Sequence, residues 1–150
     1  MIEDFKFDDC IDYKNDNIQL ELQRLCPNGI DCYFDNVGGE ILDIILLQMN
    51  CFGRIAICGS ISQYNNLGEY AKGIKNFEII LMRRLIIQGY VGFDHIPSMN
   101  DGYSEIKKLI INNQFVQKED IREVSIENYV DVINDLYYGR NCGKLIMKLI

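Results

Sequence analysis

The sequence contains few of the residues on which most hydrolytic and metal-dependent sites are built. Its 150 residues include two prolines and a single histidine, His95, which stands beside Asp94. A lone histidine is usually a surface or hydrogen-bonded residue, and no Gly-x-Ser-x-Gly turn is present to carry a nucleophilic serine. No Ser-His-Asp triad can therefore be proposed from the sequence.

Metal-binding spacings are also missing. The chain has six cysteines, but no two of them form a Cys-x-x-Cys pair, and one histidine cannot complete a cluster of zinc ligands. Most of the cysteines lie in or beside apolar runs. We therefore expect free, buried thiols in a reducing compartment and no bound metal.

Charge and hydropathy argue against two further classes of partner. The net charge of −7 opposes binding to a phosphate backbone, so nucleic acid is not an expected partner. The first residues are acidic and contain no apolar signal-peptide core. The longest apolar stretch, residues 41–59, is broken by charged side chains such as Asp43 and Arg54, so no membrane span is expected. The expected location is the cytoplasm.

Short apolar runs alternate with helical patterns along the chain. Strands are expected at residues 10–13, 30–34, 54–58, 85–91, 119–124 and 143–149. Helices are expected at residues 15–25, 41–49, 76–83, 103–112 and 128–138. This alternation predicts an α/β fold, in which a parallel sheet carries helices on its faces. From about residue 118 the order of elements is strand, helix and strand, which differs from the preceding pattern, and this segment could belong to another sheet.

Two consecutive strands end in polar or glycine-rich turns. The first turn, residues 35–39 (Asp-Asn-Val-Gly-Gly), would let another molecule approach the backbone and is followed by the free N–H groups of a helix. The second, residues 58–64, supplies small residues, hydroxyl groups and the phenol of Tyr64. Each alone could equally be a capped connection or a solvated loop. Because parallel strands end at one edge of a sheet, the two turns can converge on one ligand.

The phosphate-binding motif of a dinucleotide site is not present. The pair Gly38-Gly39 does not complete a Gly-x-Gly-x-x-Gly motif, and no charged residue follows it at the distance that would read a ribose. From the residues alone, the chain is part of a nucleotide-type α/β domain and nothing narrower.

Both turns belong to a wider set of sequence blocks. These blocks are Asp12-Tyr13-Lys14, residues 33–39, residues 52–65, Gln88-Gly89-Tyr90 and Gly143-Lys144. In order and spacing, the set resembles the zinc-independent medium-chain dehydrogenase/reductase superfamily. Within that superfamily it is most similar to the group of prostaglandin reductases (leukotriene hydroxydehydrogenases) and alkenal double-bond reductases. The resemblance covers nearly all of this chain.

The resemblance implies an oxidoreductase that uses NADPH to reduce the activated C=C bond of a small enone or enal, as in 15-oxoprostaglandin 13-reduction. Hydride is delivered to the β-carbon and the enolate is then protonated. Tyr64 is implied as the catalytic phenol, which orients the ribose or donates to the developing oxyanion. The implied cofactor-binding residues are Tyr13, Asn36, Cys58, Gly59, Ser60, Ile61, Ser62, Gln63, Tyr64, Tyr90, Val91, Gly92 and Asn141. A homodimer is left open, because edge strands of this domain often pair in the superfamily.

The resemblance is to only part of a family member. The substrate-binding barrel, the first two Rossmann strands and the phosphate loop have no counterpart here. The expected fold is a partial Rossmann sheet over residues 1–117, followed by a strand–helix–strand segment over residues 118–150. That segment would rejoin the missing barrel and should expose its apolar face. The strand at residues 10–13 is expected to pair directly with the next strand or to fray.

Three interpretations remain open at this point. In the first, the chain is a truncated member whose reductase activity belongs to a longer protein. In the second, it is a non-catalytic nucleotide-binding or interaction module that pairs with another subunit. In the third, it is an unrelated α/β domain or a different reductase of the superfamily, such as a quinone reductase. Under the first, which we adopt, the 150-residue chain is expected not to turn over alone. Phosphate anchoring and the substrate pocket both depend on residues that it lacks.

Overall fold

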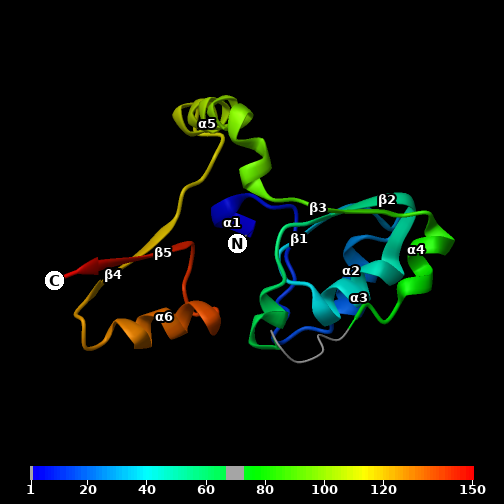
Figure 1. Ribbon diagram of the computed structural model, residues 1–150, viewed down its shortest axis with the longest axis horizontal. Coiled ribbons are helices and arrows are strands. Elements are labelled where there is room, and N and C mark those ends of the chain that lie inside the picture. The colour runs from blue at the N-terminus through cyan, green and yellow to red at the C-terminus, as the bar shows by residue number, and fades with distance from the viewer. Residues whose placement is uncertain (1, 67–72) are drawn as a thin grey trace. The chain divides into compact units, whose positions relative to one another are not determined.

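The chain forms two compact units, Met1–Ile96 and Pro97–Ile150. The structure is a computed structural model, and it describes residues 2–66 and 73–150. Each unit has its own sheet, whose strands are parallel and alternate with helices along the chain (Figure 1). Parallel strands with intervening helices confirm the predicted α/β class.

The first unit is built on a three-stranded sheet in the order β1-β2-β3. Its elements are α1 (Ile2–Phe5), α2 (Ile18–Leu25), β1 (Ile30–Asp35), α3 (Gly39–Gln48), β2 (Met49–Ile57), η1 (Ile61–Asn66), α4 (Phe77–Arg83), β3 (Ile86–Gly89) and η2 (Gly92–His95). Parallel strands cannot be joined by a tight hairpin, and here α3 and α4 make the two crossovers. Consecutive strands lie side by side, as in the second half of a doubly wound sheet.

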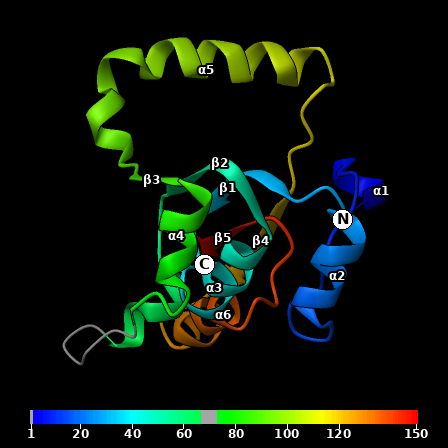
Figure 2. The same ribbon diagram turned by 90° about the vertical axis from the view of Figure 1, so that its right-hand side faces the viewer.

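One face of this sheet holds the core of the first unit. Leu46 of α3 and Met49 at the start of β2 are fully buried, and Ile55 of β2 lies against them. Leu22 brings α2 into the same cluster, and Ile79 of α4 packs on its border. Burying one such side chain contributes roughly 1.5–3 kcal/mol. These contacts hold α2, α3 and α4 against one sheet face (Figure 2).

The opposite face of the sheet, called the open face below, carries exposed apolar side chains. Phe34 of β1 is 62% exposed and Ile86 of β3 is 53% exposed. Successive side chains of a strand point to opposite faces of the sheet, so these two residues point away from the helices that cover the other face. Parallel sheets are usually covered on both sides, because their strands are apolar on both faces. The open face therefore departs from the usual architecture of an α/β unit.

The strand predicted at residues 10–13 is not formed, and that prediction is wrong. A turn takes its place, centred on Asp12. The Asp12 carboxylate accepts hydrogen bonds from the backbone amide of Lys14 at 3.1 Å and from the side chain of Asn15 at 2.7 Å. Local bonds of this kind compete with the pairing of a strand. The chain then enters α2, which Asn17 caps.

The second unit contains one helix followed by a strand–helix–strand segment. Its elements are α5 (Ile96–Ile111), β4 (Glu119–Val124), α6 (Tyr129–Tyr137) and β5 (Lys144–Leu149). β4 and β5 pair in parallel along their whole length, and α6 packs against both. Val124 is fully buried, whereas Ile121, which lies on the opposite face of β4, is 59% exposed. The segment thus forms as predicted, with an exposed apolar position on its outer face.

The two compact units divide at Ile96–Pro97, whereas the predicted domains divide at residues 117 and 118. The first division reflects contacts within this chain. The second concerns which segments would join in a longer protein, and it stays a prediction. None of the helices in the described part of the chain has the length and the apolar character that crossing a bilayer requires.

The cysteines are free thiols, but the expectation that they are buried is wrong for most of them. Those exposed are Cys10, Cys32, Cys51 and Cys142, while Cys26 and Cys58 are partly exposed. Cys32 shows the reason, because it lies on β1 beside the aromatic residues Tyr33 and Phe34 and is nonetheless exposed. An apolar run in the sequence does not say which side of the strand a given residue occupies.

An ion-pair network joins α6 to β4 in the second unit. Arg122 donates to the two carboxylate oxygens of Asp120, at 3.0 and 2.7 Å, and to Asp135 of α6 at 2.6 Å. Arg140 also contacts Asp135, at 3.0 Å. The hydrogen bonds from Arg122 hold the pKa of both carboxyl groups below their usual range. A bidentate, shared geometry makes this network a stronger contact than an isolated surface pair.

This network predicts that the second unit is labile to acid. Because the folded-state pKa values of Asp120 and Asp135 lie below the ordinary 3.8, the stabilisation is present above that value. It is lost as the pH falls through the folded values. The thermal midpoint can be measured by circular dichroism from about pH 7 to about pH 2. We expect it to decrease as the pH falls below the ordinary carboxyl pKa. Arg122→Leu should melt lower at neutral pH and lose most of this acid dependence.

The matched control is Lys148→Gln, which removes an exposed ion pair to Glu123. Exposed pairs of this kind contribute little to stability, so the control should keep the parental midpoint and the parental acid dependence. Equal pH profiles for the parent and Arg122→Leu would contradict the prediction.

Candidate functional site

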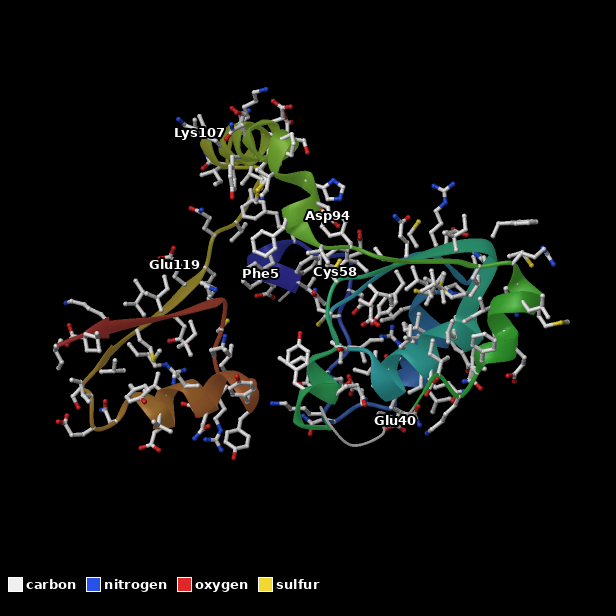
Figure 3. The ribbon with its side chains drawn as sticks, in the orientation of Figure 1. Phe5, Glu40, Cys58, Asp94, Lys107 and Glu119 are labelled. Carbon is white, nitrogen blue, oxygen red and sulfur yellow. The ribbon has the colours of Figure 1, made fainter. Side chains whose placement is uncertain are left out.

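Two turns at the carboxyl edge of the first sheet are bonded to one another. They are residues 35–39 after β1 and residues 58–63 after β2, called the paired turns below. The amides of Cys58 and Gly59 donate to the Asp35 carbonyl, at 2.7 and 3.1 Å. The amides of Ile61 and Ser62 donate at 3.2 Å to the carbonyls of residues 36 and 37. The sequence predicted a common edge, and these hydrogen bonds join the two turns. Figure 3 labels Cys58, the first residue of the second turn.

Asp35 organises the first turn. Its side chain is fully buried, and its Oδ1 atom accepts hydrogen bonds from the amides of Val37 and Gly38, each at 2.9 Å. The Tyr33 hydroxyl donates to the same oxygen at 3.1 Å. Burial, and then the neighbouring Asp35, raise the pKa of Tyr33, so this hydroxyl remains a donor. A single carboxylate oxygen thereby sets the path of the chain from β1 into α3.

Glycine is required where the first turn enters α3. Gly38 has φ 66° and ψ −159°, a region that only glycine adopts without strain. Gly59 in the second turn meets a different limit, because a Cβ atom there would stand 3.0 Å from the carbonyl oxygen of Asn36. The paired turns therefore present backbone rather than side chains at their closest approach.

The chain that follows β3 reaches the same edge. The Tyr90 amide donates to the Ile57 carbonyl at 2.8 Å, and the Tyr90 ring stacks on His95 with centroids 4.7 Å apart and planes 14° apart. Val91 and Gly92 follow, at the start of η2, and are exposed. A cavity of about 270 Å³ opens beside this stack. Its lining comprises Arg54, Ile55, Ala56, Ile86, Gln88, Gly89, Tyr90 and His95.

A second cavity, of about 300 Å³, lies beside the paired turns and the first turn of α3. Its lining is polar and comprises Gly39, Glu40, Asp43, Ser62, Gln63, Gly73 and Lys75. The Ser62 hydroxyl donates to the Val37 carbonyl at 2.6 Å, and the Oε1 atom of Gln63 is buried without a partner among the described residues. This cavity suits a ligand that carries hydrogen-bond donors.

The structure brings some of the predicted site residues together and leaves others apart. Asn36 and residues 58–63 lie in the paired turns. Tyr64 continues them in η1 and is 49% exposed, and Tyr90 follows β3. Tyr13 lies before α2, in the turn centred on Asp12, and is exposed. Asn141 belongs to the second unit, where its side-chain Nδ2 atom donates to the Gly143 carbonyl at 2.7 Å. The roles of these residues stay predictions.

Sequence reasoning placed Asp35 in the first turn, as a possible cap, but assigned neither Asp35 nor its partner Tyr33 to the site. The available signal was a polar residue at the end of an apolar strand, three positions before a pair of glycines. Such a residue can cap a helix from the surface or lie buried, and the pattern is the same in both cases. No group of three or more His, Cys, Asp or Glu side chains that could hold a metal occurs in the described part of the chain.

Comparison with known proteins finds relatives over nearly the whole chain, although no protein-family model matches it. A zinc-type alcohol dehydrogenase-like protein of Schizosaccharomyces pombe is 39% identical over 147 residues, which are 97% of this chain and 41% of the relative. The NADP(+)-dependent 2-alkenal reductase of Nicotiana tabacum is 35% identical, and the match covers 95% of this chain and 41% of the reductase. Prostaglandin reductase 1 of Bos taurus is 35% identical, and the match covers 95% of this chain and 43% of the relative.

A solved structure shows the same arrangement of elements. CurA from Vibrio vulnificus, in complex with NADPH, superposes with a TM-score of 0.84 at 30% identity, and the match covers 97% of this chain and 44% of CurA. The chain thus spans about two fifths of the length of the curated relatives it matches.

The backbone of the first turn gives a direct stability prediction. Gly38→Ala places a Cβ atom at positive φ and should lower the free energy of unfolding by about 1–3 kcal/mol. Gly89→Ala is the matched control, since no atom lies within 4 Å of its added Cβ, and it should be neutral or slightly stabilising. Denaturant unfolding followed by circular dichroism measures both. Equal stabilities for the two variants would show that the turn does not need glycine.

Proposed function

Because the chain belongs to the medium-chain dehydrogenase/reductase superfamily, within which it matches the C-terminal part of prostaglandin and alkenal reductases, we propose that it supplies the nicotinamide side of an NADPH site. The site would belong to a reductase of C=C bonds conjugated to a carbonyl group. The substrate class is a small enone or enal. The observation that carries the proposal is the joining of the paired turns at the carboxyl edge of the sheet, where open α/β sheets bind nucleotides.

The residues of the site fit the nicotinamide half of the cofactor. The buried Gln63 Oε1 atom needs a donor, and ribose hydroxyl or carboxamide N–H groups are donors of that kind. Gly92 leaves open space where a Cβ atom would stand, so a flat ring could approach the backbone there. The adenosine half has no comparable support, because the sequence carries no Gly-x-Gly-x-x-Gly loop.

The proposed division of labour among the residues follows from their chemistry. The bound cofactor would supply the hydride that adds to the β-carbon of the substrate. The side chains of Ser60 and Gln63 would hold the ribose, because the amides of residues 58, 59, 61 and 62 already donate to the first turn. Asn36 would contact the same half of the cofactor. Tyr64, whose phenol is half exposed, would donate a hydrogen bond to the carbonyl oxygen as negative charge develops there. That bond is strongest in the transition state, so it would act on the rate more than on binding.

A second candidate function is a nucleotide-binding module without catalysis. It is favoured by one observation, which is that the described part of the chain holds the paired turns but neither a phosphate loop nor a barrel for the substrate. Both candidates require binding at the paired turns, and they differ only in turnover.

Ligand titration of the full 150-residue chain tests the binding that both functions share. We expect NADPH and reduced nicotinamide mononucleotide to shift the amide resonances of residues 36, 58–63 and 90–92 in a saturable manner. Adenosine 2′,5′-bisphosphate should leave them unchanged, because it lacks the half that the chain can hold. A folded chain whose resonances respond to none of the three compounds would contradict the proposed function. The chain alone should not oxidise NADPH in the presence of a simple enone, and measurable turnover would refute that expectation.

The role of Tyr64 is tested in a chimera in which this chain replaces the matching C-terminal part of bovine prostaglandin reductase 1. Tyr64→Phe should lower kcat about tenfold or more, with little change in the affinity for NADPH, because it removes a donor to the developing oxyanion. The control is Tyr103→Phe, an exposed tyrosine of α5, which should leave both quantities unchanged. A Tyr64→Phe chimera with parental kcat would remove Tyr64 from the mechanism.

A further inference from the structure

Hydrogen bonds from both paired turns converge on Asp35. The Oδ1 atom accepts from two amides of the first turn and from the Tyr33 hydroxyl, at 2.9, 2.9 and 3.1 Å. The carbonyl oxygen of Asp35 accepts from two amides of the second turn, at 2.7 and 3.1 Å. The side chain acts on one turn and the main chain acts on the other.

The Asp35 side chain also reaches the second turn indirectly. Its carboxylate fixes the amides of Val37 and Gly38, and so it fixes the peptide groups that contain the carbonyls of Asn36 and Val37. Those carbonyls accept the amides of Ile61 and Ser62 at 3.2 Å, and the Ser62 hydroxyl at 2.6 Å. Displacing the carboxylate therefore moves acceptors on which the second turn depends.

The burial of Asp35 is costly, which argues that it is more than a local cap. The residue is fully buried, and its Oδ2 atom has no partner among the described residues. A buried carboxylate oxygen without a donor opposes folding. Helix α3 gains no side-chain cap in return, because its N-cap residue is Gly38. The arrangement leaves one buried oxygen unpaired within the described part of the chain while it fixes the geometry of the ligand-facing backbone.

We propose that Asp35 is the positioning residue of this site. Its carboxylate holds the paired turns in the one arrangement that binds the nicotinamide half of the cofactor, without itself contacting the ligand. The inference rests on the proposed function and adds to it a residue that none of the predicted contacts included. Tyr33 supports Asp35 from within β1, and its raised pKa keeps the supporting proton in place.

The test compares variants of the full chain by amide hydrogen exchange and by titration with NADPH. In Asp35→Ala, exchange at residues 37, 38, 61 and 62 should be on the order of tenfold faster, while exchange at Ile55 and Ala56 within β2 stays as in the parent. The dissociation constant for NADPH should rise about tenfold. Asp35→Asn keeps an acceptor oxygen at the same place and should recover part of both effects. That variant also keeps the test decisive if Asp35→Ala does not fold.

The control is Ile45→Val, which weakens the packing of α3 at a residue that is 6% exposed and belongs to the hydrophobic core cluster. It should lower stability by about 0.5–1.5 kcal/mol without changing the affinity for NADPH. Uniform exchange changes in Asp35→Ala, or the same loss of affinity in Ile45→Val, would reduce Asp35 to an ordinary structural residue. Equal NADPH affinity for the parent and Asp35→Ala would overturn the positioning role alone. A folded parent chain that binds no NADPH would overturn the proposed function, and this role with it.

Discussion

The parallel alignment of β1 and β2 is the constraint on which the rest of the first unit depends. It brings the ends of two strands to one edge, and the pairing continues beyond the strands, since the Asp35 carbonyl still accepts the amides of Cys58 and Gly59. The apolar face of α3 holds the strands in this register by packing Leu46 against Ile55. Packing on one side of the sheet thus determines the geometry of a polar surface at its edge.

Much of the fold could be read from the sequence because its patterns are local. Residues 119–124 and 128–138 match β4 and α6 closely, since periodicity and a following glycine define such elements without reference to the rest of the chain. The strand at residues 10–13 failed for the opposite reason. A strand exists only with a partner, and Asp12 offered its backbone a local alternative.

The site was foreseen less completely than the fold. Topology alone places two turns at one edge, so the proximity of Asn36 to residues 58–63 followed from strand order. The burial of Asp35 could not follow from any pattern, because it depends on how Tyr33 and the backbone of the turn close over it. The exposure of Cys32 was missed because a sequence run does not reveal the side of the strand on which a thiol lies.

The bonds between the paired turns also constrain the order in which the first unit can fold. β1 and α3 are neighbours in the chain and can associate early, but the carbonyls of residues 36 and 37 must wait for residues 61 and 62. Contacts between distant residues form only after the loop between them has closed. On a chain emerging from the ribosome, α2 and α3 would therefore be available before residues 61 and 62 complete the edge, and α4, which follows these residues, would join the helical layer last.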